Sequence, residues 1–280
     1  MELPSGDERI ANLSLRELTR EGGEDFLLKR INIEIDGTDW TPEQKQQLKD
    51  LAVEVVGTFH AGDVRDDKTY ATHVLRVACR ILSKNHFNAR DDYELILAAL
   101  LHDVVEDHPE RLLGLTTEPQ TLAQEQAMRD QAIEVIANKY GERVAEMVLD
   151  LTNPLYEKSK YTPAQRQDIY RSHVRDLMHG ENDARIIKLS DFIDNCLGLE
   201  YNPDPARRFK LARKYQSIIA DMRVYVRGSS IAIDVQNDIQ NDLFHADILC
   251  EHIIEEEGST ISRLGNLATS QSVPGTVKGI

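Results

Sequence analysis

Apolar residues recur at intervals of three and four along most of the chain, which is the spacing of amphipathic and buried helices. The segment 41–44, "TPEQ", opens the first such pattern with Thr at an N-cap, Pro at the first helical position and Gln three residues after the cap. Strand-like runs are short and lack the turn chemistry that joins paired strands. The pattern therefore predicts an all-α fold. The predicted helices lie near residues 42–61, 70–84, 92–106, 122–139, 142–151, 163–179, 183–199, 205–227 and 231–256.

Changes in this pattern divide the chain into four segments. Residues 1–40 are polar, rich in Gly and Glu and weakly periodic, and we expect an N-terminal extension that is partly ordered at best. Residues 41–227 form the globular helical domain. Residues 228–257 form an additional C-terminal amphipathic helix that packs on this body or on a second subunit. Residues 258–280 are small and polar, which predicts a flexible tail. The apolar positions of the C-terminal helix are Ile233, Ile239, Leu243, Ile248 and Ile253.

Composition narrows the classes of protein to which the chain belongs. Its 280 residues are 41% hydrophobic and carry a net charge of −15, which disfavours stable partnership with nucleic acid or an anionic membrane. Its apolar runs fall short of the roughly 20 residues that span a bilayer. The opening residues "MELPSGDERI" do not resemble a secretory signal. The scattered cysteines Cys79, Cys196 and Cys250 fit free thiols in a reducing compartment, so we expect a cytoplasmic protein.

Two strongly apolar helical segments carry ionisable residues that need compensation. Residues 93–110, "YELILAALLHDVVEDHPE", end in His102, Asp103, Glu106 and Asp107. Burying such groups costs several kcal/mol unless basic partners, exposure at the helix end or a metal compensates them. Within a continuous helix, His102 would lie over Glu106 and Asp103 over Asp107.

The second segment is residues 184–199, "ARIIKLSDFIDNCLGL", in which Asp191 and Asn195 share a helix face. His73 lies in a third apolar run, "YATHVLRVACR". Taken singly, each of these polar residues is more often hydrogen-bonded structure than a ligand. Taken together, two imidazoles and two carboxylates suit Mn²⁺, Fe²⁺ or Zn²⁺ and leave positions open for water and substrate.

The order of these segments resembles the HD superfamily of metal-dependent phosphohydrolases, and their flanks resemble its RelA/SpoT hydrolase domain. "ALLHDVVED" resembles the signature in which His-Asp is followed by a Glu-Asp pair, and "IIKLSDFIDN" is similar to K-L-A-D-x-x-x-N. "FHAGDVRDDKTYATH" (59–73) resembles H-x-G-Q-x-R-K-x-G-x-P-Y-x-x-H with one residue deleted. "LTNP" follows "YGERVAEMV" as L-T-K follows F-G-x-x-V in the family. The likeness runs from about residue 45 to 225 and implies an HD-domain helical bundle.

The resemblance also implies roles for individual residues. The implied metal ligands, usually for Mn²⁺, are His73, His102, Asp103 and Asp191. Glu106 and Asp107 would activate or orient the attacking water. The implied substrate contacts are Arg65 for the guanine base and Asn195 for the nucleoside. Apart from the resemblance, Lys188 is a candidate for a further cation near the phosphates, although such a lysine is more often a solvated charge. The family reaction removes the 3′-pyrophosphate from guanosine 3′,5′-bis(diphosphate), and the chain length implies a small member with the hydrolase domain alone.

The substrate-contacting residues depart from the family pattern. Asp66 replaces a basic residue, Asn153 replaces the Lys after Leu-Thr, and Asp194 replaces the His before the nucleoside-contacting Asn. Val74 replaces a Pro and Gly198 a Thr. Fewer cations near the phosphates are consistent with a less charged or different nucleotide.

Three functions stay open at this stage. The first is a Mn²⁺-dependent 3′-pyrophosphohydrolase of guanosine 3′,5′-bis(diphosphate) or a related alarmone. The second is an HD phosphohydrolase of another nucleotide. The third is a nucleotide-sensing or antitoxin-like binding module. The expected partner is a small nucleotide, and a homo-oligomer formed through the C-terminal helix is left open.

Overall fold

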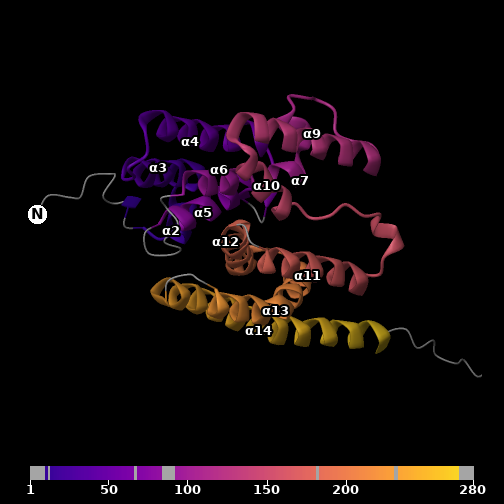
Figure 1. Ribbon diagram of the computed structural model, residues 1–280. Helices are drawn as coiled ribbons and strands as arrows, with labels where there is room; N and C mark the ends of the chain where they lie inside the picture. The colour runs from indigo at the N-terminus through magenta and orange to yellow at the C-terminus, as the bar shows by residue number, and fades with distance from the viewer. Residues whose placement is uncertain are drawn as a thin grey trace, which may run out of the picture.

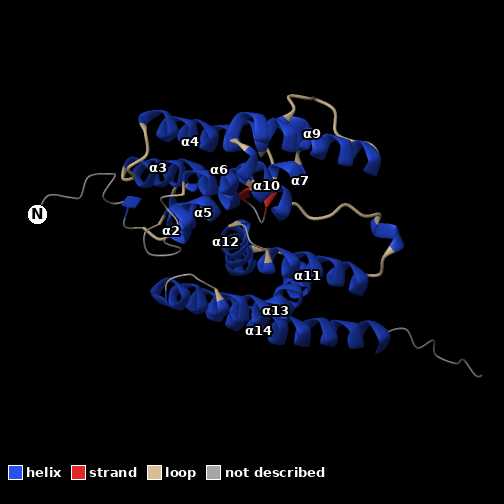
Figure 2. Cartoon of the chain, in the orientation of Figure 1, coloured by secondary structure: helices blue, strands red, loops and turns tan. Residues whose placement is uncertain are grey.

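The computed structural model describes residues 10–11, 13–65, 68–83, 92–180, 183–229 and 233–270, and for residues 65, 68, 234 and 259–270 it describes the backbone alone. Helices dominate these residues, which confirms the predicted all-α fold (Figure 2). A single antiparallel pair joins β1 (Val64–Arg65) to β2 (Lys68–Thr69) within the described chain. The helices are α2 (Leu15–Glu21), α3 (Gly23–Asp36), α4 (Pro42–Glu54), η1 (Val55–Phe59), α5 (Ala71–Leu82), α6 (Tyr93–Leu101), α7 (Val104–Asp107), α8 (Pro109–Leu112), α9 (Leu122–Tyr140), α10 (Glu142–Leu151), η2 (Lys158–Lys160), α11 (Pro163–His179), α12 (Ala184–Leu197), η3 (Gly198–Tyr201), α13 (Pro205–Gly228) and α14 (Ile233–Ser270).

The helices before residue 40 correct the expectation of a partly ordered extension. Ser14 and Glu17 form a capping box at the start of α2. Along α3, Leu27, Ile31 and Ile35 repeat every four residues and are fully buried, so this face packs into the core. The sequence pattern did not predict these helices because the average composition of residues 1–40 is polar. Residues 15–36 are therefore part of the helical body.

The helices α5, α6 and α12 form the centre of the molecule. Every residue of α6 from Leu95 to Leu101 is buried, and α5 is buried along almost its whole length. Such helices are apolar on all sides because neighbouring helices cover every face. In Figure 1, α3, α4, α6, α9 and α10 lie on one side of α12, and α11, α13 and α14 lie on the other. This arrangement brings polar groups from distant parts of the chain into the protein interior.

The predicted helix over 92–106 is interrupted. Helix α6 ends at Leu101, His102 and Asp103 form a turn, and α7 begins at Val104. The expected i, i+4 relation is kept for one pair, because the backbone N–H of Asp107 donates to the carbonyl oxygen of Asp103 at 2.9 Å. The turn places two consecutive polar side chains at the end of a buried helix.

The C-terminal helices pack as a pair along one edge of the molecule (Figure 1). Helix α14 continues through Ser270, so the predicted boundary of a flexible tail at 258 is wrong, and residues 271–280 lie outside the described residues. Ile239, Leu243 and Ile253 are buried as expected, whereas Ile233 and Ile248 are exposed. Among the described helices, none combines the length and apolar character required to cross a membrane.

Candidate metal centre and catalytic site

Four predicted ligands gather where α5, the end of α6 and α12 meet. The ligand atoms of His73, His102 and Asp191 all lie within 4.8 Å of one another, and all three residues are buried. Nε2 of His73 is 3.3 Å from a carboxylate oxygen of Asp191. Oδ2 of Asp103 lies 3.0 Å from Nε2 of His102 and 3.6 Å from Nε2 of His73. Residues up to 118 positions apart in sequence thus share one interior site.

Both imidazoles turn Nε2 toward this site and form their other contact through Nδ1. Nδ1 of His102 lies 2.8 Å from the carbonyl oxygen of Ala99, and Nδ1 of His73 lies 2.8 Å from Oδ2 of Asp194. A proton held at each Nδ1 by these acceptors leaves the Nε2 lone pairs for a cation. The rings are therefore oriented before any ligand binds.

The two carboxylates are held by hydrogen bonds from neighbouring side chains. The Tyr70 hydroxyl donates to Oδ2 of Asp103 at 2.7 Å. The Lys188 ammonium donates to Oδ2 of Asp191 at 3.0 Å, and the Asn195 amide donates to its Oδ1. These donors fix the carboxylates in the positions that face the imidazoles.

Both carboxylates stay ionised in this environment. Burial alone would raise the pKa of Asp103, but its interactions with His102 and His73 hold it well below its usual range. The same opposing effects act on Asp191, where the charge of Lys188 is the main cause of a lowered pKa. Ionised carboxylates are the form that binds cations.

The residues present fit a divalent metal ion. Nε2 of His102 is buried 3.0 Å from the Asp103 carboxylate, so with its proton on Nδ1 it presents a lone pair to an ionised oxygen, an arrangement that a cation between them would stabilise. Two imidazoles with two carboxylates match the preferences of first-row divalent cations. This cluster of His and Asp side chains is therefore able to hold one.

The predicted acidic pair lies next to this cluster, on α7. Oε2 of Glu106 accepts hydrogen bonds from the backbone N–H of Asn153 at 3.0 Å and from its side-chain amide at 2.8 Å. Asp107 keeps an exposed side chain, yet desolvation raises its pKa to about 7, with the charges of Asp103 and Glu106 adding to the effect. A carboxyl group that titrates near neutral pH is suited to accept a proton from water.

Of the three predicted substrate contacts, the structure describes the side chains of Lys188 and Asn195. Arg65 belongs to β1, but its side chain lies outside the described residues, as does Asp66. Lys188 and Asn195 both donate to Asp191, which shows that they orient this carboxylate. Direct contact of Lys188 or Asn195 with a substrate stays a prediction.

Three residues around the centre were given no role by the sequence. Asp194 binds the ring of His73, Tyr70 binds Asp103, and Asn153 binds Glu106. Spacing offered a signal for two of them, because Tyr70 precedes His73 by three residues and Asp194 follows Asp191 by three. A separation of three places both members of each pair on one side of a helix.

A cavity of about 560 Å³ opens beside His73 and Asp194. It extends between α2, one face of α5 along its whole length and the end of α12, and α3 and α14 also contribute to its wall. Five arginines and three acidic residues belong to its lining, and four of the arginines form ion pairs: Arg16 with Glu200, Arg30 with Glu34, and Arg76 and Arg80 with Asp194. The arginines are Arg16, Arg20, Arg30, Arg76 and Arg80.

The family comparison agrees with this geometry. Residues 70–196 match the family model described as HD domain. The matched span contains His73, His102, Asp103 and Asp191, together with the helices that bring them together. This match, over slightly less than half of the chain, supports the similarity to the HD superfamily that the sequence predicted.

A curated relative supports the RelA/SpoT type within that superfamily. The chain is 30% identical over 155 residues to a guanosine-3′,5′-bis(diphosphate) 3′-pyrophosphohydrolase of Aquifex aeolicus (strain VF5). The alignment covers 55% of this chain and 18% of the length of that protein.

Proposed function

We propose that this protein is a Mn²⁺-dependent 3′-pyrophosphohydrolase of guanosine 3′,5′-bis(diphosphate) or of a closely related alarmone. Water would add at the phosphorus of the 3′ phosphoester, releasing pyrophosphate and leaving the free 3′-hydroxyl of the nucleotide. The observation that carries the proposal is the convergence of two oriented imidazoles and two ionised carboxylates in one buried site. The HD-domain match and the similarity to the Aquifex enzyme support it.

Four side chains would hold the metal ion: His73, His102, Asp103 and Asp191. Such an ion polarises a phosphoryl oxygen and makes bound water more acidic. The chain supplies the orientation of the ligands, through the contacts of Asp194, Tyr70 and Lys188 with them.

Glu106 and Asp107 would act on the attacking water. Asn153 fixes the Glu106 carboxylate with two hydrogen bonds, so this group is suited to position the water. Asp107 carries the raised pKa and would accept the proton. We therefore assign the positioning of the water to Glu106 and the acceptance of its proton to Asp107.

The arginine-lined cavity beside His73 is the feature of the surroundings that favours an anionic substrate such as a nucleotide. A polyanion enters an acidic protein only where cations offset its charge. Arginines of α2, α3 and α5 line the cavity next to His73, and its volume of about 560 Å³ is within the range of small-molecule sites. Of the predicted metal ligands His73 alone belongs to this lining, so the cavity borders the cluster without containing Asp103 or Asp191.

The test is an assay of phosphate products from a panel of nucleotides. Metal-free protein is supplied with Mn²⁺, Mg²⁺ or Zn²⁺ and incubated with guanosine and adenosine 3′,5′-bis(diphosphates) and with 2′- and 3′-monophosphates. Pyrophosphate release that is fastest with Mn²⁺ is the expected result. Absence of pyrophosphate release from all 3′-pyrophosphorylated nucleotides would contradict the proposal.

A phosphohydrolase of another nucleotide is the second candidate. Its support is the replacement of family cations by Asp66, Asn153 and Asp194, of which Asp194 and Asn153 now serve as hydrogen-bond partners of the site. Release of orthophosphate from a monophosphate in the same panel would identify this activity. A binding module is distinguished by Asp103→Ala, since a biological effect that survives this change does not need hydrolysis.

A further inference from the structure

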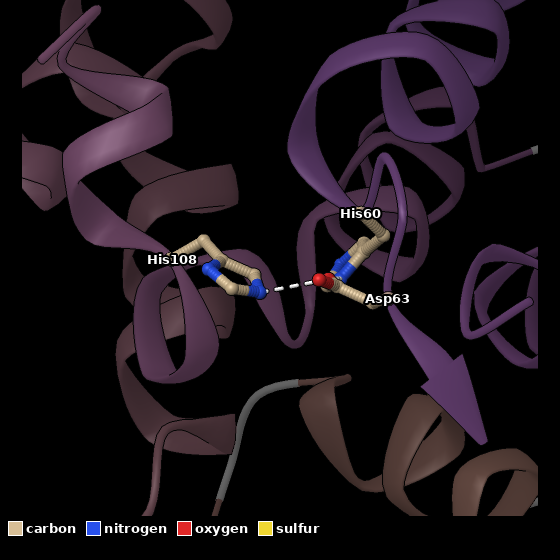
Figure 3. Close-up of side chains that lie close together, drawn as sticks. All are labelled: His60, Asp63 and His108. Carbon is tan, nitrogen blue, oxygen red and sulfur yellow. Dashed lines mark ion pairs between the residues drawn. The ribbon is translucent and has the colours of Figure 1, made fainter. Parts of the chain in front are cut away.

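A second group of possible metal ligands lies apart from the cluster described above. His60 follows η1, Asp63 lies in the turn before β1, and His108 follows α7, and their side chains point toward one another (Figure 3). Nε2 of His108 is 2.7 Å from Oδ2 of Asp63, and Nδ1 of His60 is 3.4 Å from the same oxygen. All three ligand atoms lie within 4.8 Å of one another.

His60 is the most informative member of this group. Its side chain is 1% exposed, and neither ring nitrogen makes a hydrogen bond within the described residues. Buried polar atoms of native proteins are almost always satisfied, so an imidazole with two unsatisfied nitrogens calls for a missing partner. Its Nδ1 faces the Asp63 carboxylate at the edge of the group. A cation between these two atoms is such a partner.

His108 has the support typical of a metal-binding histidine. Its Nδ1 lies 3.1 Å from Oε1 of Glu110, and Glu110 is buried. A carboxylate on the far nitrogen fixes the ring and makes the other nitrogen a better ligand. Here the other nitrogen is Nε2, which faces Asp63.

Arg111 holds the turn that carries the other two members. Its guanidinium donates to the carbonyl oxygens of Phe59 and Ala61 at 3.0 and 3.2 Å. It also donates to Oδ1 and Oδ2 of Asp63 at 3.2 and 3.4 Å. The shorter contact is to Oδ1, which leaves Oδ2 facing the two imidazoles. Ligating carboxylates commonly receive such outer hydrogen bonds, which set their orientation.

Tyr70 separates this group from the first cluster. Its ring packs against the ring of His60 with centroids 4.9 Å apart, while its hydroxyl donates to Asp103. The two groups therefore have no ligand in common. Their separation by one side chain means that each can be removed by substitution without deleting a ligand of the other.

We propose that His60, Asp63 and His108 form a second divalent-cation site that takes a borderline transition metal ion such as Zn²⁺. Two imidazoles and one carboxylate are a recurrent ligand set for Zn²⁺, with the remaining position open to water. The bound ion joins the turn after η1 to the segment after α7. The alternative is a metal-free hydrogen-bonded pair of His108 and Asp63 with His60 merely packed beside it. The inference does not depend on the substrate or the reaction of the first centre.

The experiment counts Zn²⁺ ions bound by the metal-free full chain. Titration calorimetry and elemental analysis after gel filtration are applied to the wild type and to His60→Gln, His108→Gln and His73→Gln. We expect two ions per wild-type chain and one in each variant. His252→Gln is the matched control, because His252 is exposed and lies outside both groups, and it should retain two. One ion in the wild type together with none in His73→Gln would overturn the second site.

Cobalt spectroscopy on the folded wild type keeps the test decisive if a substituted chain fails to fold. Co²⁺ reports its ligands through visible absorption bands, so two sites should give two successive spectral changes at one equivalent each. Circular dichroism identifies any variant that has lost its helices. A single spectral change ending at one equivalent would overturn the proposal. A loss of the first ion in His73→Gln with the second retained would support it whatever nucleotide the protein hydrolyses.

Discussion

Nδ1 of His73 lies 2.8 Å from Oδ2 of Asp194, a residue 121 positions later in the chain. The same carboxylate accepts hydrogen bonds from Arg76 at 2.8 and 2.9 Å, and Arg80 lies 3.4 Å from it. Burial would raise the pKa of Asp194, but Arg76 and His73 hold it well below its usual range. A charged carboxylate thus anchors the imidazole whose opposite nitrogen faces the metal cluster.

Asp194→Asn should weaken metal binding without removing a ligand. The amide keeps the shape of the side chain but loses the negative charge that orients and polarises His73. Loss of such an outer partner typically costs about 10–100-fold in metal affinity. Competition between the protein and a fluorescent chelator for Mn²⁺ measures this change.

Asp130→Asn is the matched control for that substitution. Asp130 is exposed on α9 and bonds to Gln126 of its own helix, so its replacement should leave Mn²⁺ affinity unchanged. Equal affinities for both variants and the wild type would show that Asp194 has no influence on the metal centre.

The sequence predicted the helical fold and the members of the first cluster because both depend on patterns within helices. The apolar circumference of α6 and α12 marked His102, Asp103 and Asp191 as exceptions that need a partner. The break after Leu101 could not be predicted, because residues 102–107 contain neither Pro nor Gly. Helix α3 was missed because the Gly- and Glu-rich composition of residues 1–40 outweighed the apolar repeat of Leu27, Ile31 and Ile35.

Contacts between side chains far apart in the chain could not be predicted from the sequence. His60 and His108 are 48 positions apart, and neither lies in a regular apolar repeat. Asp194 was visible only as a departure from the family pattern, with no indication that it binds His73. Such pairings depend on how helices pack, which hydrophobic spacing within one segment does not specify.

Asn153→Ala should lower kcat while leaving metal affinity unchanged. The change removes one of the two hydrogen bonds to Oε2 of Glu106 and keeps the one from the backbone N–H. A hydrogen bond to a charged group contributes about 1.5 kcal/mol, which corresponds to roughly a tenfold loss if the carboxylate acts in the reaction. Steady-state kinetics under saturating Mn²⁺, with a parallel binding titration, separate the two effects.

Asn138→Ala provides the comparison for Asn153→Ala. The Asn138 amide bonds to a carbonyl of its own helix and is exposed. It should retain wild-type kcat. A tenfold fall in metal affinity for Asn153→Ala, with kcat intact, would contradict a role for Asn153 in positioning Glu106 for catalysis.

Arg143→Ala should destabilise the fold at neutral pH by about 1 kcal/mol, a modest amount because the ion pairs are partly exposed. Arg143 binds Asp92 at 2.6 Å, Glu94 at 3.0 Å and Asp183 at 2.8 Å, which joins α10 to the start of α6 and the residue before α12. Urea denaturation of the variant and the wild type measures the difference. Lys160→Ala removes one exposed ion pair and should change the free energy of unfolding far less.

This contribution should disappear in acid. Burial would raise the pKa of Asp92, but hydrogen bonds from Arg143 and the backbone lower it below its usual value. A carboxyl group with a lowered folded-state pKa stabilises the fold above its unfolded-state pKa of about 3.9 and loses that effect as the pH falls. The difference between wild type and Arg143→Ala should therefore be complete at pH 7 and shrink below about pH 4. A difference that is constant across this range would exclude the ion pairs as its cause.

Leu27→Ala tests whether α3 belongs to the core that supports the metal centre. Leu27 is fully buried, and its carbonyl oxygen lies 3.9 Å from Sγ of Cys79 on α5, the helix that carries His73. Truncation of a buried Leu costs about 2–5 kcal/mol through lost apolar burial and the cavity left behind. Urea denaturation should show a loss in this range, whereas Val53→Ala, at a residue 59% exposed, should change stability little. Equal free energies of unfolding for the two variants would contradict the assignment of residues 15–36 to the core.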